Sequence, residues 1–117
     1  MGDVLSEEET DSQNPRLKAL RAFAAQRPDD PFPRYALAME LKATGDLAGA
    51  CEVFGTLIAE RPDYIASYAP AGEVLVALGR AADARAIYVK GIEACARKND
   101  AHMQGNLKDA LAMLDGV

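Results

Sequence analysis

Groups that carry out chemistry are scarce in this sequence. It has no tryptophan, one histidine, His102, and two cysteines, Cys51 and Cys95, which are 44 residues apart. A metal site needs several such ligands at short spacings, and a lone histidine is more often a surface or packing residue than a base. The glycines form neither of the common phosphate-binding motifs. We therefore expect no catalytic residues, no metal ligands and no cofactor, so that the protein is not an enzyme.

Clustered positive charge and long apolar runs are also missing. The 13 basic residues are interleaved with 18 acidic ones, and the net charge is −5. Nucleic-acid binding requires clusters of Lys and Arg that neutralise phosphates, so this pattern argues against such a partner. We also expect no membrane span, because no run of about eighteen apolar residues occurs, and no signal peptide. Two isolated thiols, interpreted as small core residues, suit a reducing compartment, and we expect a cytoplasmic protein.

The residues that are abundant favour helices. Half of the sequence is apolar, mostly alanine and leucine, and β-branched residues are few. A chain of 117 residues is long enough for one domain with its own core. Residues 1–13 are acidic and polar, and we expect them to form a disordered tail. The single domain is predicted to span residues 14–117.

Turn-forming residues recur at a constant spacing. Gly45 and Gly79 are 34 residues apart, and so are Pro28 and Pro62. Each of them interrupts a helical pattern, which gives two helices per unit. Small and aromatic residues recur at matching offsets from the two glycines, as Ala50 and Ala84, and as Phe54 and Tyr88. Small residues allow helices to approach closely and an aromatic ring fills the gap, so the spacing predicts stacked helical hairpins.

The repeated residues resemble the tetratricopeptide repeat, whose pattern is W-x2-L-G-x2-Y…A-x3-F…P. The first unit matches at Leu37-Ala38, Leu41, Ala50, Phe54 and Pro62, and the second at Tyr68, Gly72, Leu75, Ala84 and Tyr88. Two positions depart from the pattern. Arg34 stands where the repeat usually has tryptophan, and Ala96 replaces the second closing proline, so that helix is expected to run further.

This resemblance implies an all-α fold, a right-handed superhelical solenoid of antiparallel helical hairpins with about six helices. A half-repeat helix is predicted at 15–27, repeat one at 31–62, repeat two at 65–97 and a capping helix at 100–115. With Ser67 as the N-cap of its helix, Pro70 lies in the first turn, where a missing N–H is tolerated. We therefore expect this first helix of repeat two to start later than its counterpart in repeat one.

In the tetratricopeptide family the first helices of successive hairpins line a concave groove that holds a ligand peptide. The resemblance implies that the groove residues are Phe32, Tyr35, Met39, Lys42, Ala69, Glu73 and Val76. Some members grip a carboxylate with a clamp of Lys, Asn and Arg, but the matching positions hold Tyr35, Met39 and Pro70. The groove therefore suits an apolar or mixed segment. An alternative place for Phe32 or Tyr35 is inward, in the space left by the missing tryptophan.

The function that this resemblance predicts is that of a non-catalytic interaction module or adaptor. It would bind a peptide or partner protein in the groove. The alternative is a self-assembling scaffold, whose copies pair through the groove or through the apolar stripe of Leu107, Leu111 and Leu114. A third possibility is a non-catalytic subunit of a larger enzyme complex. The protein is accordingly expected to be a monomer or a weak homodimer.

Overall fold

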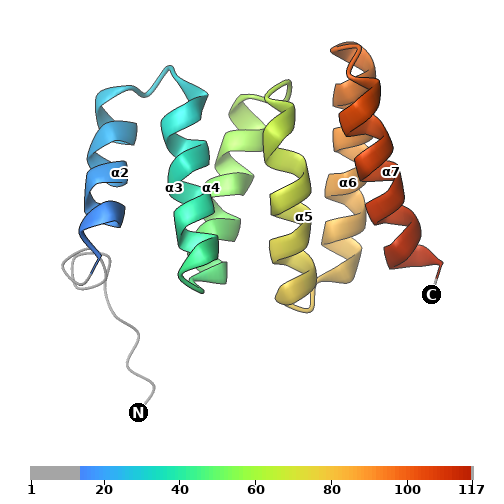
Figure 1. The fold of residues 1–117 in the computed structure, drawn as a ribbon, viewed down its shortest axis with the longest axis horizontal. Coiled ribbons are helices and arrows are strands. Elements are labelled where there is room, and N and C mark those ends of the chain that lie inside the picture. The colour runs from blue at the N-terminus through green and yellow to red at the C-terminus, as the bar shows by residue number, and fades with distance from the viewer. Residues whose placement is uncertain (1–13, 117) are drawn as a thin grey trace.

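The computed structural model describes residues 14–116, which form six α-helices and one short 3₁₀ helix in a row (Figure 1). The helices are α2 (Pro15–Gln26), α3 (Pro31–Ala43), α4 (Leu47–Glu60), α5 (Tyr68–Ala77), α6 (Ala81–Arg97) and α7 (Ala101–Asp115), with the 3₁₀ helix η1 (Ile65–Ser67) before α5. The described residues contain no strand, and the predicted all-α fold of about six helices is confirmed. The predicted disordered tail, residues 1–13, lies outside the described residues.

Four helices begin at a polar side chain that caps the first turn. Side-chain oxygens of Asn14, Asp30, Asp46 and Asp100 accept hydrogen bonds from backbone N–H groups at the starts of α2, α3, α4 and α7. Each bond satisfies a donor that the helix leaves without a partner, and such a cap stabilises a helix by about 1 kcal/mol. Local sequence therefore determines most of the helix starts.

The first helices of both repeats, α3 and α5, end at a glycine in the left-handed conformation. Gly45 and Gly79 have φ angles of 89° and 76°, which glycine adopts without strain. The Asp46 N–H then donates to the Leu41 carbonyl at 2.9 Å, and the turn after α5 contains the equivalent bond at 2.8 Å. Both helices end in the same hydrogen-bonded turn, which explains why the two glycines recur with the repeat.

Repeat two departs from repeat one in both of its helices. The α-helical part of α5 begins only at Tyr68, after η1, and Pro70 lies in its first turn. Ser67 stands at the N-cap position, but its side chain makes no capping hydrogen bond, because η1 already brings its backbone into the helical region. α6 has 17 residues and α4 has 14, because Ala96 continues the helix where Pro62 prevents continuation.

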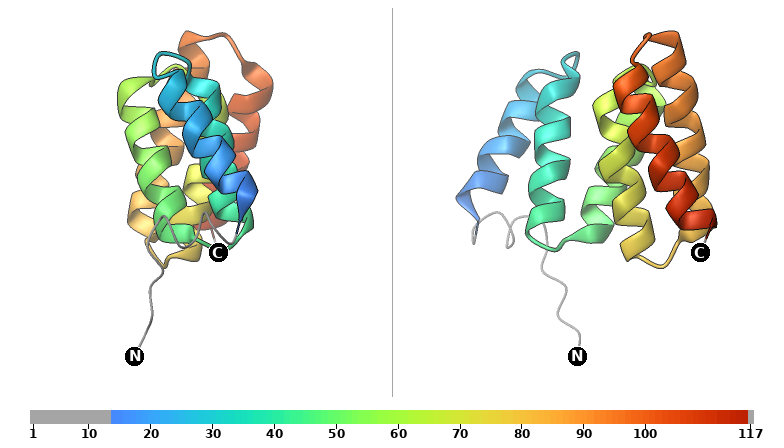
Figure 2. Two further views of the ribbon diagram at one scale, coloured as in Figure 1. Left: turned by 90° about the vertical axis from the view of Figure 1, so that its left-hand side faces the viewer. Right: turned by 45° about the vertical axis from the view of Figure 1, so that its right-hand side comes forward.

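Successive helices pack against one another and build two layers. α3, α5 and α7 lie in front of α4 and α6 in Figure 1, and α5 also contacts α7. The side view in Figure 2 shows α4 on one side of the molecule and α7 on the other. Each helix contributes a buried side chain to the core between them: Leu17, Leu41, Phe54, Val74, Cys95 and Leu107. This layering places the outer surfaces of α3, α5 and α7 on one face.

Arg34, at the position where the repeat usually has tryptophan, is largely buried. Its side chain is 15% exposed, and its Nη1 pairs with Glu60 Oε1 at 2.8 Å. Its Nε and Nη2 atoms are buried and have no hydrogen-bond partner among the described residues. Buried donors without a partner cost free energy, so Arg34 depends on its single bond to Glu60.

Candidate partner-binding face

The outer surfaces of α3, α5 and α7 form what we call the α3–α5–α7 face (Figure 1). On α5, Glu73 and Val76 are exposed, whereas Ala71 and Leu75 are buried. Successive residues of a helix are rotated by about 100°, so these two pairs lie on opposite sides of α5. One side of α5 therefore contributes to the core and the other is free to meet a partner.

The most exposed large hydrophobic side chains in residues 14–116 all belong to the three helices of this face. Phe32 on α3 is 52% exposed, Val76 on α5 is 45% exposed, and Met113 on α7 is 75% exposed. Single exposed apolar residues need no explanation, but Val76 and Met113 lie on neighbouring helices and line the same hollow, and apolar side chains grouped in this way are typical of an interaction surface.

A hollow of about 450 Å³ lies between α5 and α7. It is lined by Glu73, Val76, Tyr88, Ala110, Met113 and Leu114. Tyr88 comes from α6 and is buried beneath the other side chains. Burial raises the pKa of Tyr88 above its ordinary value, and the Glu73 carboxylate raises it further, so the ring stays neutral. The hollow has the size and the apolar lining to accept one or two side chains of a partner.

An aromatic cluster lies at the other end of the face, where α3 begins. The Phe32 and Tyr35 ring centroids are 6.4 Å apart, and Tyr35 meets Tyr64 edge to face at 5.7 Å. Tyr35 is half-buried against the core, while Phe32 remains exposed. Burial raises the pKa of Tyr64, and nearby Tyr35 and Asp30 add to the shift. Tyr35 therefore contacts both the core and the exposed ring of Phe32.

An ion pair connects α3 and α5 across the face. Lys42 Nζ lies 3.2 Å from Glu73 Oε1, so each charge neutralises the other. Among the predicted groove residues, Phe32, Glu73 and Val76 are exposed, and the half-buried members are Tyr35, Met39, Lys42 and Ala69. The structure thus places all of them on α3 or α5. Their role in binding stays a prediction.

Sequence reasoning missed the contribution of α7. The helix was expected to cap the solenoid or, as an alternative, to pair copies through its apolar stripe, yet Ala110, Met113 and Leu114 line the hollow beside α5. The alternation of helices could have indicated this, because α7 follows α6 just as α5 follows α4. Leu107, from the proposed self-assembly stripe, is fully buried, and Leu111 and Leu114 are half-buried. The stripe belongs mainly to the core.

The potential metal-binding side chains of the described residues do not form a cluster. No three or more His, Cys, Asp or Glu side chains in residues 14–116 are grouped so that they could hold a metal ion. Cys95 is buried, and burial raises the pKa of its thiol, with Asp100 adding to the shift. No helix in this part of the chain combines the length and apolarity that a bilayer crossing requires.

Comparison with known proteins finds a family and solved structures that are similar to this chain. The tetratricopeptide repeat family matches residues 31–55 and 66–88. The solution structure of a tetratricopeptide repeat domain protein from Salinibacter ruber is 33% identical over 77% of this chain and 91% of its own, with a TM-score of 0.73. A crystal structure of a tetratricopeptide repeat domain protein from the same organism is 32% identical, with 76% and 99% coverage and a TM-score of 0.72.

A more distant similarity concerns the fold alone. The solution structure of a protein from Bordetella parapertussis is 22% identical, covers 84% of this chain and 85% of its own, and has a TM-score of 0.71. A search of curated proteins finds no match. The similarities therefore identify the architecture and leave the partner undefined.

Proposed function

Because the chain belongs to the tetratricopeptide repeat family, whose repeats generally mediate protein–protein interactions, we propose that it is a non-catalytic adaptor. It binds a peptide or a partner protein on the α3–α5–α7 face. The observation that carries this proposal is the presence of one exposed large hydrophobic side chain on each helix of that face, namely Phe32, Val76 and Met113. The free thiols of Cys51 and Cys95 suit work in a reducing cytoplasm.

The chemistry of the face favours an apolar or mixed partner segment. The one cation among the predicted groove residues, Lys42, is already paired with Glu73, so it does not offer an open carboxylate site. Apolar contacts are available on either side, at Phe32 and in the hollow next to Met113. The face thus presents an apolar contact, a neutral ion pair and a second apolar contact, which match a segment with two apolar anchors separated by uncharged residues. A charged residue between the anchors would compete for one member of the ion pair and leave the other buried without a partner.

Affinity purification with the full chain, followed by mass spectrometry and calorimetry of the recovered partner, tests the proposal. Tyr35→Ala with Met39→Ala, and separately Phe32→Ala with Met113→Ala, should weaken that partner at least about fivefold, which corresponds to a loss of about 1 kcal/mol when anchor residues of an interface are truncated. Val53→Ala on α4 is the matched control, because Val53 is a half-buried side chain of the opposite layer. If both double variants keep their helical circular dichroism and bind as the wild type does, the assignment of the face is wrong.

The alternative occupant of the same face is a second copy of the chain. Met113, near the end of α7, is the most exposed large hydrophobic side chain in residues 14–116 and would lie in such a contact. Size-exclusion chromatography with light scattering at several concentrations separates the two cases. A concentration-dependent dimer that Met113→Ala abolishes would assign self-assembly to this face, and a monomer at all concentrations would leave it to a different partner.

A further inference from the structure

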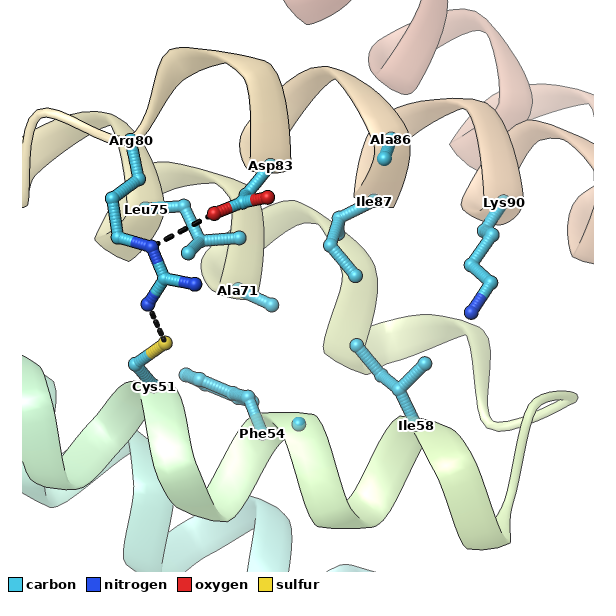
Figure 3. Close-up of a pocket in the computed structure, with 11 residues that line it drawn as sticks. Cys51, Phe54, Ile58, Ala71, Leu75, Arg80, Asp83, Ala86, Ile87 and Lys90 are labelled. Atoms are coloured by element: carbon cyan, nitrogen blue, oxygen red, sulfur yellow. Dashed lines mark hydrogen bonds and ion pairs between the residues drawn. The ribbon is translucent and has the colours of Figure 1, made fainter.

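The opposite layer contains a cleft of about 340 Å³ between α4 and α6, which we call the α4–α6 cleft (Figure 3). Figure 3 shows Phe54 and Ile58 from α4 and Ile87 from α6 directed into the space between the helices. Ala71 and Leu75 of α5 form its base. These two α5 residues lie on the side of the helix away from Glu73 and Val76, so the cleft is separate from the α3–α5–α7 face.

Gly55 keeps this cleft open. It lies within α4 and lines the cleft, and a Cβ atom added to it would meet nothing within 4 Å. The residue one repeat later is Val89. Glycine inside a helix is less stable than alanine, and here neither a close approach nor a left-handed φ requires it. The absent side chain leaves the space between α4 and α6 open to an incoming group.

Charged side chains stand at both ends of the cleft. At one end Arg80 Nε pairs with Asp83 Oδ2 at 2.8 Å, and Arg80 Nη1 lies 3.6 Å from Cys51 Sγ. At the other end Lys90 has no hydrogen bond or ion pair among the described residues, and Figure 3 shows its side chain extending from α6 toward α4. One cation and one ion pair leave the lining with a net positive charge around an apolar centre.

We propose that the α4–α6 cleft is a second binding site, which accepts an aliphatic side chain of a partner segment flanked by carboxylates. The aliphatic group enters the space beside Gly55, and a flanking carboxylate pairs with Lys90. A basic segment is repelled by the same lining, and a nucleic acid requires a cluster of unpaired cations that the lining does not supply. Two sites on opposite layers allow the protein to connect two partners.

Nuclear magnetic resonance on the isotope-labelled full chain tests this site independently of the α3–α5–α7 face. The probes are the peptide acetyl-Glu-Glu-Ile-Leu-Glu-Glu-amide and its counterpart with lysines in place of the glutamates. We expect the acidic peptide to shift the signals of Gly55, Ile58 and Ile87 and to leave those of Val76 and Met113 in place. The basic peptide should bind at least about fivefold more weakly, because it lacks the Lys90 pair and meets like charge. Shifts confined to Val76 and Met113 would overturn the proposal and leave the α3–α5–α7 face as the binding surface.

Two variants with matched controls decide between the site and nonspecific attraction. Gly55→Leu places a side chain in the cleft and should abolish the shifts, whereas Gly105→Leu, at another glycine with open space, should not. Lys90→Glu should reverse the preference between the two peptides, and Lys108→Glu, an exposed lysine of α7, should preserve it. Unchanged binding in both Gly55→Leu and Lys90→Glu would refute the site. Concentration-dependent shifts of Ile87 without any peptide, removed by Gly55→Leu, would assign the cleft to a second copy and overturn the choice of partner.

Discussion

Adding one methyl group at Gly72 on α5 is expected to create a steric clash in the core and destabilise the fold. A Cβ atom at this residue would lie 2.2 Å from Cε1 and 2.5 Å from Cζ of Tyr88, far inside van der Waals contact. Gly72 and Tyr88 are both buried, and α5 packs directly against α6. The substitution Gly72→Ala therefore requires the Tyr88 ring to move or the two helices to separate.

Two opposing effects determine the size of the change. Alanine favours a helix over glycine by roughly 0.5–1 kcal/mol, whereas an extra group in a close-packed core costs about 1–3 kcal/mol. Because the buried Tyr88 ring has to shift from its packed position, we expect the free energy of unfolding to fall by about 1–2 kcal/mol. In a domain of this size that corresponds to a decrease in Tm of roughly 5–10 °C.

Urea unfolding followed by circular dichroism measures this effect, with Gly55→Ala as the control. A Cβ atom at Gly55 meets nothing within 4 Å, so Gly55→Ala should raise the free energy of unfolding by roughly 0.5–1 kcal/mol through helix propensity alone. In a Tyr88→Leu background, which lacks the clashing ring atoms, Gly72→Ala should no longer destabilise, with a coupling energy of about 1 kcal/mol or more. If Gly72→Ala stabilises the wild type as much as Gly55→Ala does, the close approach of α5 to Tyr88 is refuted.

Two further predictions concern buried polar groups. Glu60→Ala should lower the free energy of unfolding by about 1–2 kcal/mol in urea titrations, because it removes the one bond that the buried Arg34 side chain makes. Arg34→Leu should lower the free energy of unfolding less, or raise it, because it removes the buried charge as well. Equal losses in the two variants would contradict this explanation. Burial raises the pKa of Tyr68, Tyr88 and Cys95, so the unfolded chain ionises first when the pH rises. Thermal melts should therefore show constant stability up to the ordinary Cys pKa of 9.0 and a loss of stability above it, which becomes steeper above the ordinary Tyr pKa of 10.0. The loss should be shallower in Tyr88→Phe, and a rise in stability above pH 10 would rule this explanation out.

The sequence by itself determined the helices and their order. Asn14, Asp30 and Asp46 cap helix starts, Gly45 ends a helix, and Pro62 prevents continuation. Each signal acts through hydrogen bonds or sterics within about five residues, so it can be recognised without a fold. The repeat spacing then predicted stacked hairpins, because small and aromatic residues must meet at the same place in each unit.

The tertiary structure alone decided which side chains share a surface. The hollow beside Met113, the ion pair between Lys42 and Glu73, and the α4–α6 cleft next to Gly55 each join residues from different helices. Half-burial of Tyr35 likewise depends on its contact with Tyr64, which lies beyond α4. Such contacts follow from how helices cross and how neighbouring side chains fill the remaining space, and local sequence patterns do not encode those distances.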